Sequence, residues 1–266
     1  LSFKIGTFGV LKTLMRVLSR RSLGVQRLPN FLNIKYTKPQ KGNRMTYKQD
    51  YLDDILVRMA YHSSGIEGNT ISLPETVSII LESTLPGKHK SIREFYEIEN
   101  HKQAFSLLLD GLANHAPLTL GLVQDFHALL TDRLQHDRGQ FKTVQNAIIG
   151  AEFKTASPEE TPFLMTQWVD NTAYRLDMVK SEREIVEVLA DTHIQLERIH
   201  PFSDGNGRAG RLILMYLAMK YLGAPVIVSK NDRAEYMELL ANQNIQGLAD
   251  LLQQSLDAEK ERMRQF

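Results

Sequence analysis

The stretch that decides the fold is residues 199–211, which read Ile-His-Pro-Phe-Ser-Asp-Gly-Asn-Gly-Arg-Ala-Gly-Arg. An apolar run with helical spacing, residues 212–221, follows it directly. A glycine-rich turn that opens a helix directs several backbone N–H groups, and the positive end of the helix dipole, toward one point. Phosphate oxygens suit such a point, so we expect a polyanion site at the N-terminus of this helix.

The charged side chains of the stretch fit the same chemistry. Arg208 and Arg211 are three residues apart and share a helix face, so both guanidinium groups can reach one phosphate chain. Asp204 can hold a divalent cation, which prefers hard oxygen ligands and usually keeps substrate phosphates in its shell. His200 has the chemistry of a general base, because an imidazole with a pKa of about 6.5 is mostly neutral at pH 7.

Two other interpretations of the stretch are possible. Residues 205–210 also fit the dinucleotide-binding pattern Gly-x-Gly-x-x-Gly, with a strand-like segment at 225–229 and Asp232 farther on. That pattern requires a preceding strand, whereas residues 185–199 have helical spacing behind a capping box at 181–184. A glycine turn with incidental charges would explain the turn but not the histidine, the aspartate, the asparagine and two arginines together.

The stretch resembles the motif of the Fic family, His-x-Phe-x-Asp/Glu-Gly-Asn-Gly-Arg-x-x-Arg, and every specified position matches. The resemblance implies an enzyme that transfers AMP from ATP to a Tyr, Thr or Ser hydroxyl of a target protein. His200 would then deprotonate the hydroxyl, Asp204 would bind Mg²⁺, and Phe202 would be a packing anchor. The nucleotide-binding residues implied by the resemblance are Gly205, Asn206, Gly207, Arg208 and Arg211.

A second match lies upstream, at residues 63–68, which read Ser-Ser-Gly-Ile-Glu-Gly. This segment resembles the inhibitory motif of the family, Ser/Thr-x-x-x-Glu-Gly/Asn, at Ser63, Glu67 and Gly68. The resemblance implies that Glu67 pairs with Arg211 and pushes ATP into an unproductive pose. The alternative is an ordinary helix end with a solvated glutamate and a glycine stop. Whether Glu67 also positions a water that removes AMP from the target is left open.

A short apolar segment at residues 146–153 is too short for a helix and predicts a small β-hairpin. By resemblance it would be a flap that aligns the target through backbone pairing, although ordinary hairpin packing is the alternative. The flap residues would be Ile148, Ile149, Gly150, Ala151, Glu152 and Phe153.

Four further residues were singled out. Tyr236 lies in a segment that resembles one near the adenosine in the family, but the segment also fits the start of an amphipathic helix. Lys142 stands where the resemblance leads us to expect an arginine, so its role is open. His127 and His193 lie on apolar helix faces and are expected to be satisfied histidines of the core.

The rest of the sequence predicts an all-α protein, a Fic-type helical bundle whose one exception is the hairpin flap. The chain has 266 residues, of which 42% are hydrophobic and 24% charged, as in soluble globular proteins. It has no cysteine, which excludes disulfides, thiolate zinc sites and a cysteine nucleophile. Helical spacing predicts helices from about residue 47 to 65, 72 to 85, 92 to 113, 120 to 134, 162 to 178, 182 to 199 and 212 to 221.

Charge divides the chain into regions. Residues 1–44 carry 10 basic and no acidic residues; since the whole chain has 32 Lys+Arg and 31 Asp+Glu, the remainder has 22 basic and 31 acidic residues. This basic leader can be upstream sequence outside the native protein, an arm for anionic surfaces, or a targeting peptide. We favour the first, because Met45 resembles a natural start. We expect a helical region with the inhibitory motif at 45–115, a catalytic core at 116–258 and a tail at 259–266.

The expected partners are ATP, Mg²⁺ and a protein with a hydroxyl side chain, and a homo-oligomer is compatible with the sequence. We expect no nucleic-acid partner and a cytoplasmic location. We also expect no membrane partner, because no apolar run approaches the roughly 18 residues of a membrane span. The alternatives are a Fic enzyme that transfers UMP, phosphocholine or phosphate, and a silent nucleotide-binding regulator. Asp204 and both arginines favour a nucleoside triphosphate donor, and His200 argues against a pure binding role.

Overall fold

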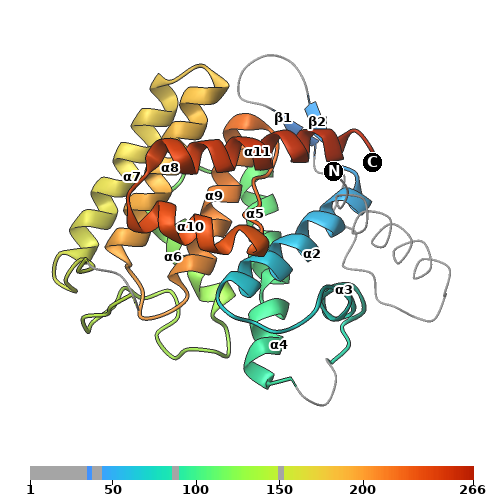
Figure 1. The fold of residues 1–266 in the computed structure, drawn as a ribbon, viewed down its shortest axis with the longest axis horizontal. Coiled ribbons are helices and arrows are strands. Elements are labelled where there is room, and N and C mark those ends of the chain that lie inside the picture. The colour runs from blue at the N-terminus through green and yellow to red at the C-terminus, as the bar shows by residue number, and fades with distance from the viewer. Residues whose placement is uncertain (1–34, 38–43, 86–89, 149–152) are drawn as a thin grey trace. The chain divides into compact units, whose positions relative to one another are not determined.

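A computed structural model describes residues 35–37, 44–85, 90–148 and 153–266 of the chain (Figure 1). All of them belong to one structural unit, Leu32–Phe266. The helices of this part are α2 Gln49–Ile66, α3 Leu73–Glu82, α4 Ile92–Glu99, α5 His101–Ala113, α6 Leu120–Leu130, α7 Thr161–Met178, α8 Glu182–Ile199, α9 Asn206–Leu222, the short 3₁₀ helix η1 Lys230–Asp232, α10 Arg233–Ala241 and α11 Ile245–Met263. The predicted all-α class is confirmed.

Strands play a minor part in the described residues. β1, Lys35–Thr37, pairs antiparallel with β2, Arg44–Thr46. Residues 146–148 and 153, which belong to the expected hairpin, and residues 154–156 after it form no strand, so the predicted β-flap is not seen in the described residues. Ile149, Gly150, Ala151 and Glu152 lie outside the described residues. The prediction rested on an apolar run, whereas in the described residues on either side the Gln145 side-chain amide donates to the carbonyl and hydroxyl oxygens of Thr155.

The helix starts follow from local chemistry. Ser72 caps α3 and Ser181 caps α8, each in the predicted capping box in which a glutamate three residues later bonds back to the serine backbone. Each N-cap of this kind contributes about 1 kcal/mol. These short-range signals explain why the starts of α3 and α8 lie where the sequence predicts them.

Two helix boundaries differ from the prediction because of long-range contacts. The expected single helix over 92–113 is broken at Asn100, whose side-chain amide donates to the carbonyls of Leu130 and Asp132. The helix expected to reach residue 134 ends at Leu130, and the Thr131 hydroxyl donates to the His127 carbonyl there. The two changes are connected, since Asn100 ties the α4–α5 junction to the end of α6.

Helix α9 is the centre of the bundle. Residues 208–219 are all buried, and α9 contacts α2, α5, α6 and α8, while α7 and α11 pack on α8 (Figure 1). A helix that is apolar on every side is stable only when neighbours enclose it. Its N-terminal end, which carries the motif, is therefore presented by a rigid support. Within the described residues, no helix is both long and apolar enough to cross a bilayer.

The last segment of the chain holds α2 in place. Residues 259–263, placed in the expected tail, continue α11, and Glu259 is buried in an ion pair with Arg58 of α2. Arg262 pairs with Asp54, which is 1% exposed and also pairs with Arg58. Helix α2, which ends in the inhibitory motif, is thus joined to the core by a network of buried charges.

We expect Asp54→Asn to lower the free energy of unfolding by about 3 kcal/mol, because two largely buried guanidinium groups lose their shared carboxylate. Urea denaturation monitored by circular dichroism measures the change. The control is Asp110→Asn, on the exposed face of α5, which should stay within about 0.5 kcal/mol of the parent. Equal stability of the two variants would show that the network does not hold α2.

Candidate active site

His200 lies at the junction between α8 and the motif loop, with φ 51° and ψ 60°. A left-handed backbone is unfavourable for a residue with a β-carbon and occurs where surrounding contacts enforce it. The Nδ1 atom lies 3.2 Å from the Glu197 carbonyl oxygen. A carbonyl only accepts hydrogen bonds, so Nδ1 carries the proton and Nε2 keeps its lone pair.

The environment of His200 favours its neutral form. Burial lowers the pKa of His200 below its ordinary value, and the Lys142 ammonium acts in the same direction, whereas Glu67 and Asp204 act against them. The net pKa shift is downward. A neutral imidazole with a free Nε2 is the state that a general base needs at neutral pH.

Side-chain amides hold the loop after His200. Asn206 accepts from the Phe202 N–H and donates to the Phe202 carbonyl, both at 2.8 Å. Asn146 donates to the carbonyls of His200 and Phe202. The amide of Asn206 thus holds the loop with its oxygen and with one of its two N–H donors.

His127 and Phe202 form the floor of the loop. Their rings stack with centroids 3.7 Å apart, and both are almost completely buried. Nδ1 of His127 accepts from the Gly139 N–H, and its Nε2 donates to the Asp204 carbonyl at 2.8 Å. The prediction of a satisfied core histidine is confirmed, and this histidine also fixes the backbone of Asp204.

The N-terminus of α9 is open to an anion. Gly205 has φ +80°, and a β-carbon there would lie 2.8 Å from the Thr131 methyl group, so only glycine fits. No side chain caps α9, and its first N–H groups keep no helical partner. A β-carbon on Gly207 would collide with the Glu67 carboxylate, which thus lies directly over this turn.

The predicted pair between Glu67 and Arg211 is formed. The Arg211 Nη2 atom donates to Glu67 Oε1 at 2.5 Å and to the Ser63 carbonyl at 2.9 Å, and Nε donates to the Ser63 hydroxyl at 3.0 Å. Arg211 is 4% exposed and Glu67 42% exposed. Burial raises the pKa of Glu67, but the charge and hydrogen bond of Arg211 outweigh it and lower the pKa overall. Gly68 follows with φ +95°, which lets the chain leave the helix.

Asp204 lies at the edge of the site, with its side chain 53% exposed. Its Oδ1 accepts from the Gly205 N–H, and its Oδ2 accepts from Arg93 Nη2 at 2.8 Å. Arg93 comes from α4 and also pairs with Glu97, which accepts from Asn69 just after the inhibitory motif. Asp204 is therefore connected to the inhibitory turn through side chains that no sequence motif marks.

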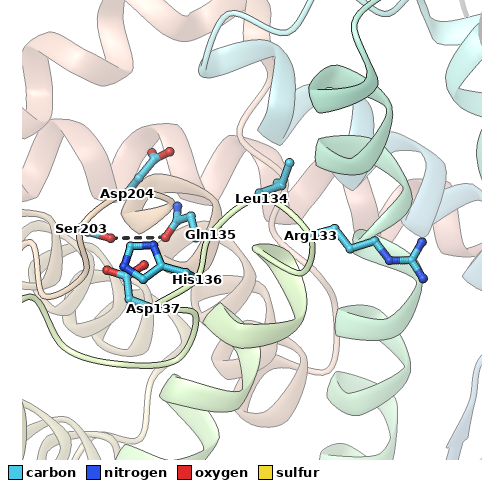
Figure 2. Close-up of a pocket in the computed structure, with 7 residues that line it drawn as sticks. All are labelled: Arg133, Leu134, Gln135, His136, Asp137, Ser203 and Asp204. Atoms are coloured by element: carbon cyan, nitrogen blue, oxygen red, sulfur yellow. Dashed lines mark hydrogen bonds between the residues drawn. The ribbon is translucent and has the colours of Figure 1, made fainter.

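A cavity of about 510 Å³ opens beside Asp204 (Figure 2). The lining residues are Arg133, Leu134, Gln135, His136, Asp137, Ser203 and Asp204. Among the described residues, no group of three or more His, Cys, Asp or Glu side chains is placed to hold a metal. A single carboxylate still fits Mg²⁺, which is usually bound by one or two carboxylates, substrate phosphates and water.

The side chains of Arg208 and Tyr236 are both buried below the protein surface. Arg208 is 2% exposed, donates to the Leu130 carbonyl, and has its pKa lowered by burial. The Tyr236 hydroxyl contacts His193 Nε2 at 2.7 Å, and both side chains are buried, as expected for His193. This geometry favours a packing role for Tyr236 next to Arg211, and its contact with a nucleotide stays a prediction.

One buried carboxyl oxygen, Oε1 of Glu197, has no hydrogen bond within the described residues, and His193 Nε2 lies 3.9 Å from it. Burial raises the pKa of Glu197 to about 7. The same oxygen would lie 2.6 Å from a β-carbon on Gly210, so this glycine permits the close packing of α8 and α9.

Residues 117–218 match the model of the Fic/DOC family. This chain carries a Fic/DOC family domain. The Fic domain contains His200, Asp204 and Arg211, while Glu67 and Arg93 reach it from helices upstream of its first residue. The pair between Glu67 and Arg211 therefore joins two regions of the chain.

Relatives and solved structures agree with the family. Protein adenylyltransferase Fic of Drosophila willistoni is 31% identical over 224 residues, which are 80% of this chain and 42% of that protein. Protein adenylyltransferase fic-1 of Caenorhabditis elegans is 33% identical over 194 residues, which are 72% of this chain and 36% of that protein. The chain thus spans less than half the length of these relatives.

The fold is similar in two solved structures. Fic-1 of Caenorhabditis elegans has a TM-score of 0.70 at 26% identity, over 82% of this chain and 66% of that one. A Fic-domain signalling protein of Bacteroides thetaiotaomicron has a TM-score of 0.67 at 24% identity, over 81% and 93%. The helical Fic fold of the chain is confirmed.

Several residues that contact the loop of residues 200–205 were not predicted from the sequence. No role was predicted for Arg93 or Asn146, and the role of Lys142 stayed open, although Lys142 donates to the Ile199 carbonyl beside the base. Asn146 lay within the expected hairpin, where an amide has no special meaning. Arg93 is 111 residues from Asp204, and no local pattern could have indicated the contact.

We expect the His200 imidazole to titrate below pH 6.5, because burial and Lys142 disfavour the charged form. Histidine ring signals followed by NMR between pH 4 and 8 measure it, and the signal lost in His200→Gln assigns it. A midpoint at or above 6.5 would contradict the environment described for the base.

Proposed function

We propose that this chain is a protein adenylyltransferase, which transfers AMP from ATP to a Tyr, Thr or Ser hydroxyl of a target protein. The observation that carries the proposal is the contact of His200 Nδ1 with the Glu197 carbonyl, which leaves Nε2 to accept a proton, just before the uncapped N-terminus of α9. The names of the two relatives, both protein adenylyltransferases, support AMP as the transferred group. A binding protein would need the helix end but no base.

The reaction uses few groups of the chain. His200 Nε2 takes the proton of the target hydroxyl, whose oxygen forms a bond to the α-phosphorus of ATP. The bond from that phosphorus to the bridging oxygen breaks, and pyrophosphate leaves. The backbone N–H groups of Gly207 and its neighbours hold the phosphate oxygens, while Arg208 and Arg211 supply positive charge. The positions of the target and of the phosphates relative to these groups determine the rate.

Asp204 is the residue that would hold Mg²⁺. The ion neutralises charge on the phosphates when it is bound. Arg93 donates to Oδ2 of Asp204, so this arginine competes with a metal for one oxygen of the carboxylate. Asp204 lines the cavity together with the residues drawn in Figure 2, and its side chain is 53% exposed, so solvent reaches the carboxylate.

The chain is inhibited by its own Glu67 in this proposal. The carboxylate lies over Gly207, where a phosphate would approach, and it occupies the guanidinium group of Arg211. Both effects oppose a productive pose of the triphosphate. The half-exposed Glu67 carboxylate also favours a second activity, in which it positions a water that hydrolyses AMP from the target. Faster loss of AMP with the parent than with Glu67→Ala would support that activity.

We expect Glu67→Gly to raise the incorporation of label from α-³²P-ATP into protein by about 10²-fold, the scale on which one charge-stabilising group acts. Adding His200→Ala should remove the gain, because a general base contributes about 10²- to 10⁴-fold. The assay compares parent, single and double variants with Mg²⁺ and a host lysate as target. If no variant incorporates AMP while label from UTP or γ-labelled ATP does appear, the donor is wrong.

We expect Arg93→Ala, in the Glu67→Gly background, to lower the Mg²⁺ concentration for half-maximal transfer about two- to fivefold. An exposed pair competes only modestly with a metal for its carboxylate. Arg183→Ala is the matched control, since Arg183 also pairs with a glutamate four residues on and with a carboxylate on another helix. An unchanged Mg²⁺ requirement in Arg93→Ala would mean that the pair does not compete with the metal.

A further inference from the structure

Lys142 is a buried cation that forms no ion pair with a carboxylate of the described residues. The residue is 3% exposed, and its Nζ atom donates to Asn146 Oδ1 at 2.8 Å, to the Ile199 carbonyl at 3.1 Å and to the Thr155 hydroxyl at 3.3 Å. An ammonium group has three donors, and all three are used on neutral oxygens. Burying a charge that is bonded only to neutral oxygens costs free energy, and a methionine of similar length would avoid this cost. A role in packing alone therefore does not explain an ammonium here.

The contacts of Lys142 lie on both sides of His200, in the loop between α8 and α9. Its side chain holds the carbonyl of Ile199, and its own backbone N–H donates to the carbonyl of Pro201 at 2.8 Å. Asn146, which the ammonium orients through Oδ1, donates to the carbonyl of His200 at 3.1 Å. Three consecutive carbonyl groups, of residues 199 to 201, are thus fixed directly or through one amide.

Such fixation matters because His200 has a left-handed backbone. This conformation is unfavourable for histidine and persists only while neighbouring contacts enforce it. A relaxed backbone at this residue would swing the imidazole away from the N-terminus of α9.

We propose that Lys142 is a positioning residue for His200, which clamps the carbonyl groups around the base and so fixes the direction of its imidazole. The inference rests on the proposed function, in which His200 is the base. The charge of Lys142 has a second effect, because it lowers the pKa of His200 in concert with burial and against the carboxylates of Glu67 and Asp204. Burial lowers the pKa of Lys142 itself to about 8, so the clamp weakens above that pH.

The test compares Lys142→Met, Lys142→Arg and Lys220→Met in the Glu67→Gly background. Lys220 is the matched control, because it is a partly buried lysine that donates to a backbone carbonyl, that of Ala116, at the opposite end of α9. Lys142→Met should lower kcat about 10- to 100-fold, the scale of a small misplacement of a reacting group. The KM for ATP should stay within about twofold, because the residues proposed to hold the nucleotide are untouched. Lys142→Arg should retain most of the kcat, and Lys220→Met should retain all of it.

A second measurement separates this inference from the proposed function. NMR titration of His200 requires no transfer activity, and it should show a higher midpoint in Lys142→Met and an unchanged one in Lys142→Arg. If no variant transfers AMP but the midpoint shifts in this way, the proposed reaction fails and the placement of Lys142 stands. An unshifted midpoint together with an unchanged kcat in Lys142→Met would overturn the inference. The inference would also be overturned if Lys142→Met and Lys220→Met both lost kcat in proportion to their loss of folding stability.

Discussion

The uncapped N-terminus of α9 is the constraint on which the rest of the site depends. The N-terminus of a helix leaves its first N–H groups without partners, and burying it costs free energy unless other groups accept hydrogen bonds from them. Here no side chain caps the helix, and the carboxylate of Glu67 lies over Gly207 at its first turn. An anion near a helix N-terminus is favourable. The negative charge of Glu67 thus lies where the proposed function places a phosphate of ATP.

The loop before α9 shows how few residues hold this end open. Gly205 permits the positive φ, Asn206 closes the loop on Phe202, and His127 supports the backbone of Asp204 from below. The side chains of Asn206 and His127 both bind backbone groups of the loop. In the proposed function, the backbone N–H groups at the start of the buried helix α9 then need little rearrangement to receive a phosphate.

Sequence reasoning succeeded where the signal was local and failed where it was not. The capping boxes at Ser72 and Ser181 need only four residues, and the motif loop lies within one short segment, so both were predictable. The break at Asn100 depends on carbonyls 30 and 32 residues away, and the Arg93–Asp204 pair spans 111 residues. The β-hairpin failed for a related reason, because apolar spacing alone does not reveal that side-chain hydrogen bonds hold a segment.

The pair between Glu67 and Arg211 is asymmetric, and this decides how inhibition can end. Arg211 is fully enclosed and keeps two hydrogen bonds to Ser63 when Glu67 departs, so it is the fixed partner. Glu67 is 42% exposed and stands at the last turn of α2, so its carboxylate can return to water. The body of α2 cannot follow easily, because Arg58 and Asp54 tie it to α11 through buried ion pairs. In the proposed function, release therefore requires only that the Glu67 side chain turns away from Arg211, and a triphosphate that offers Arg211 another anion competes directly with Glu67 for it.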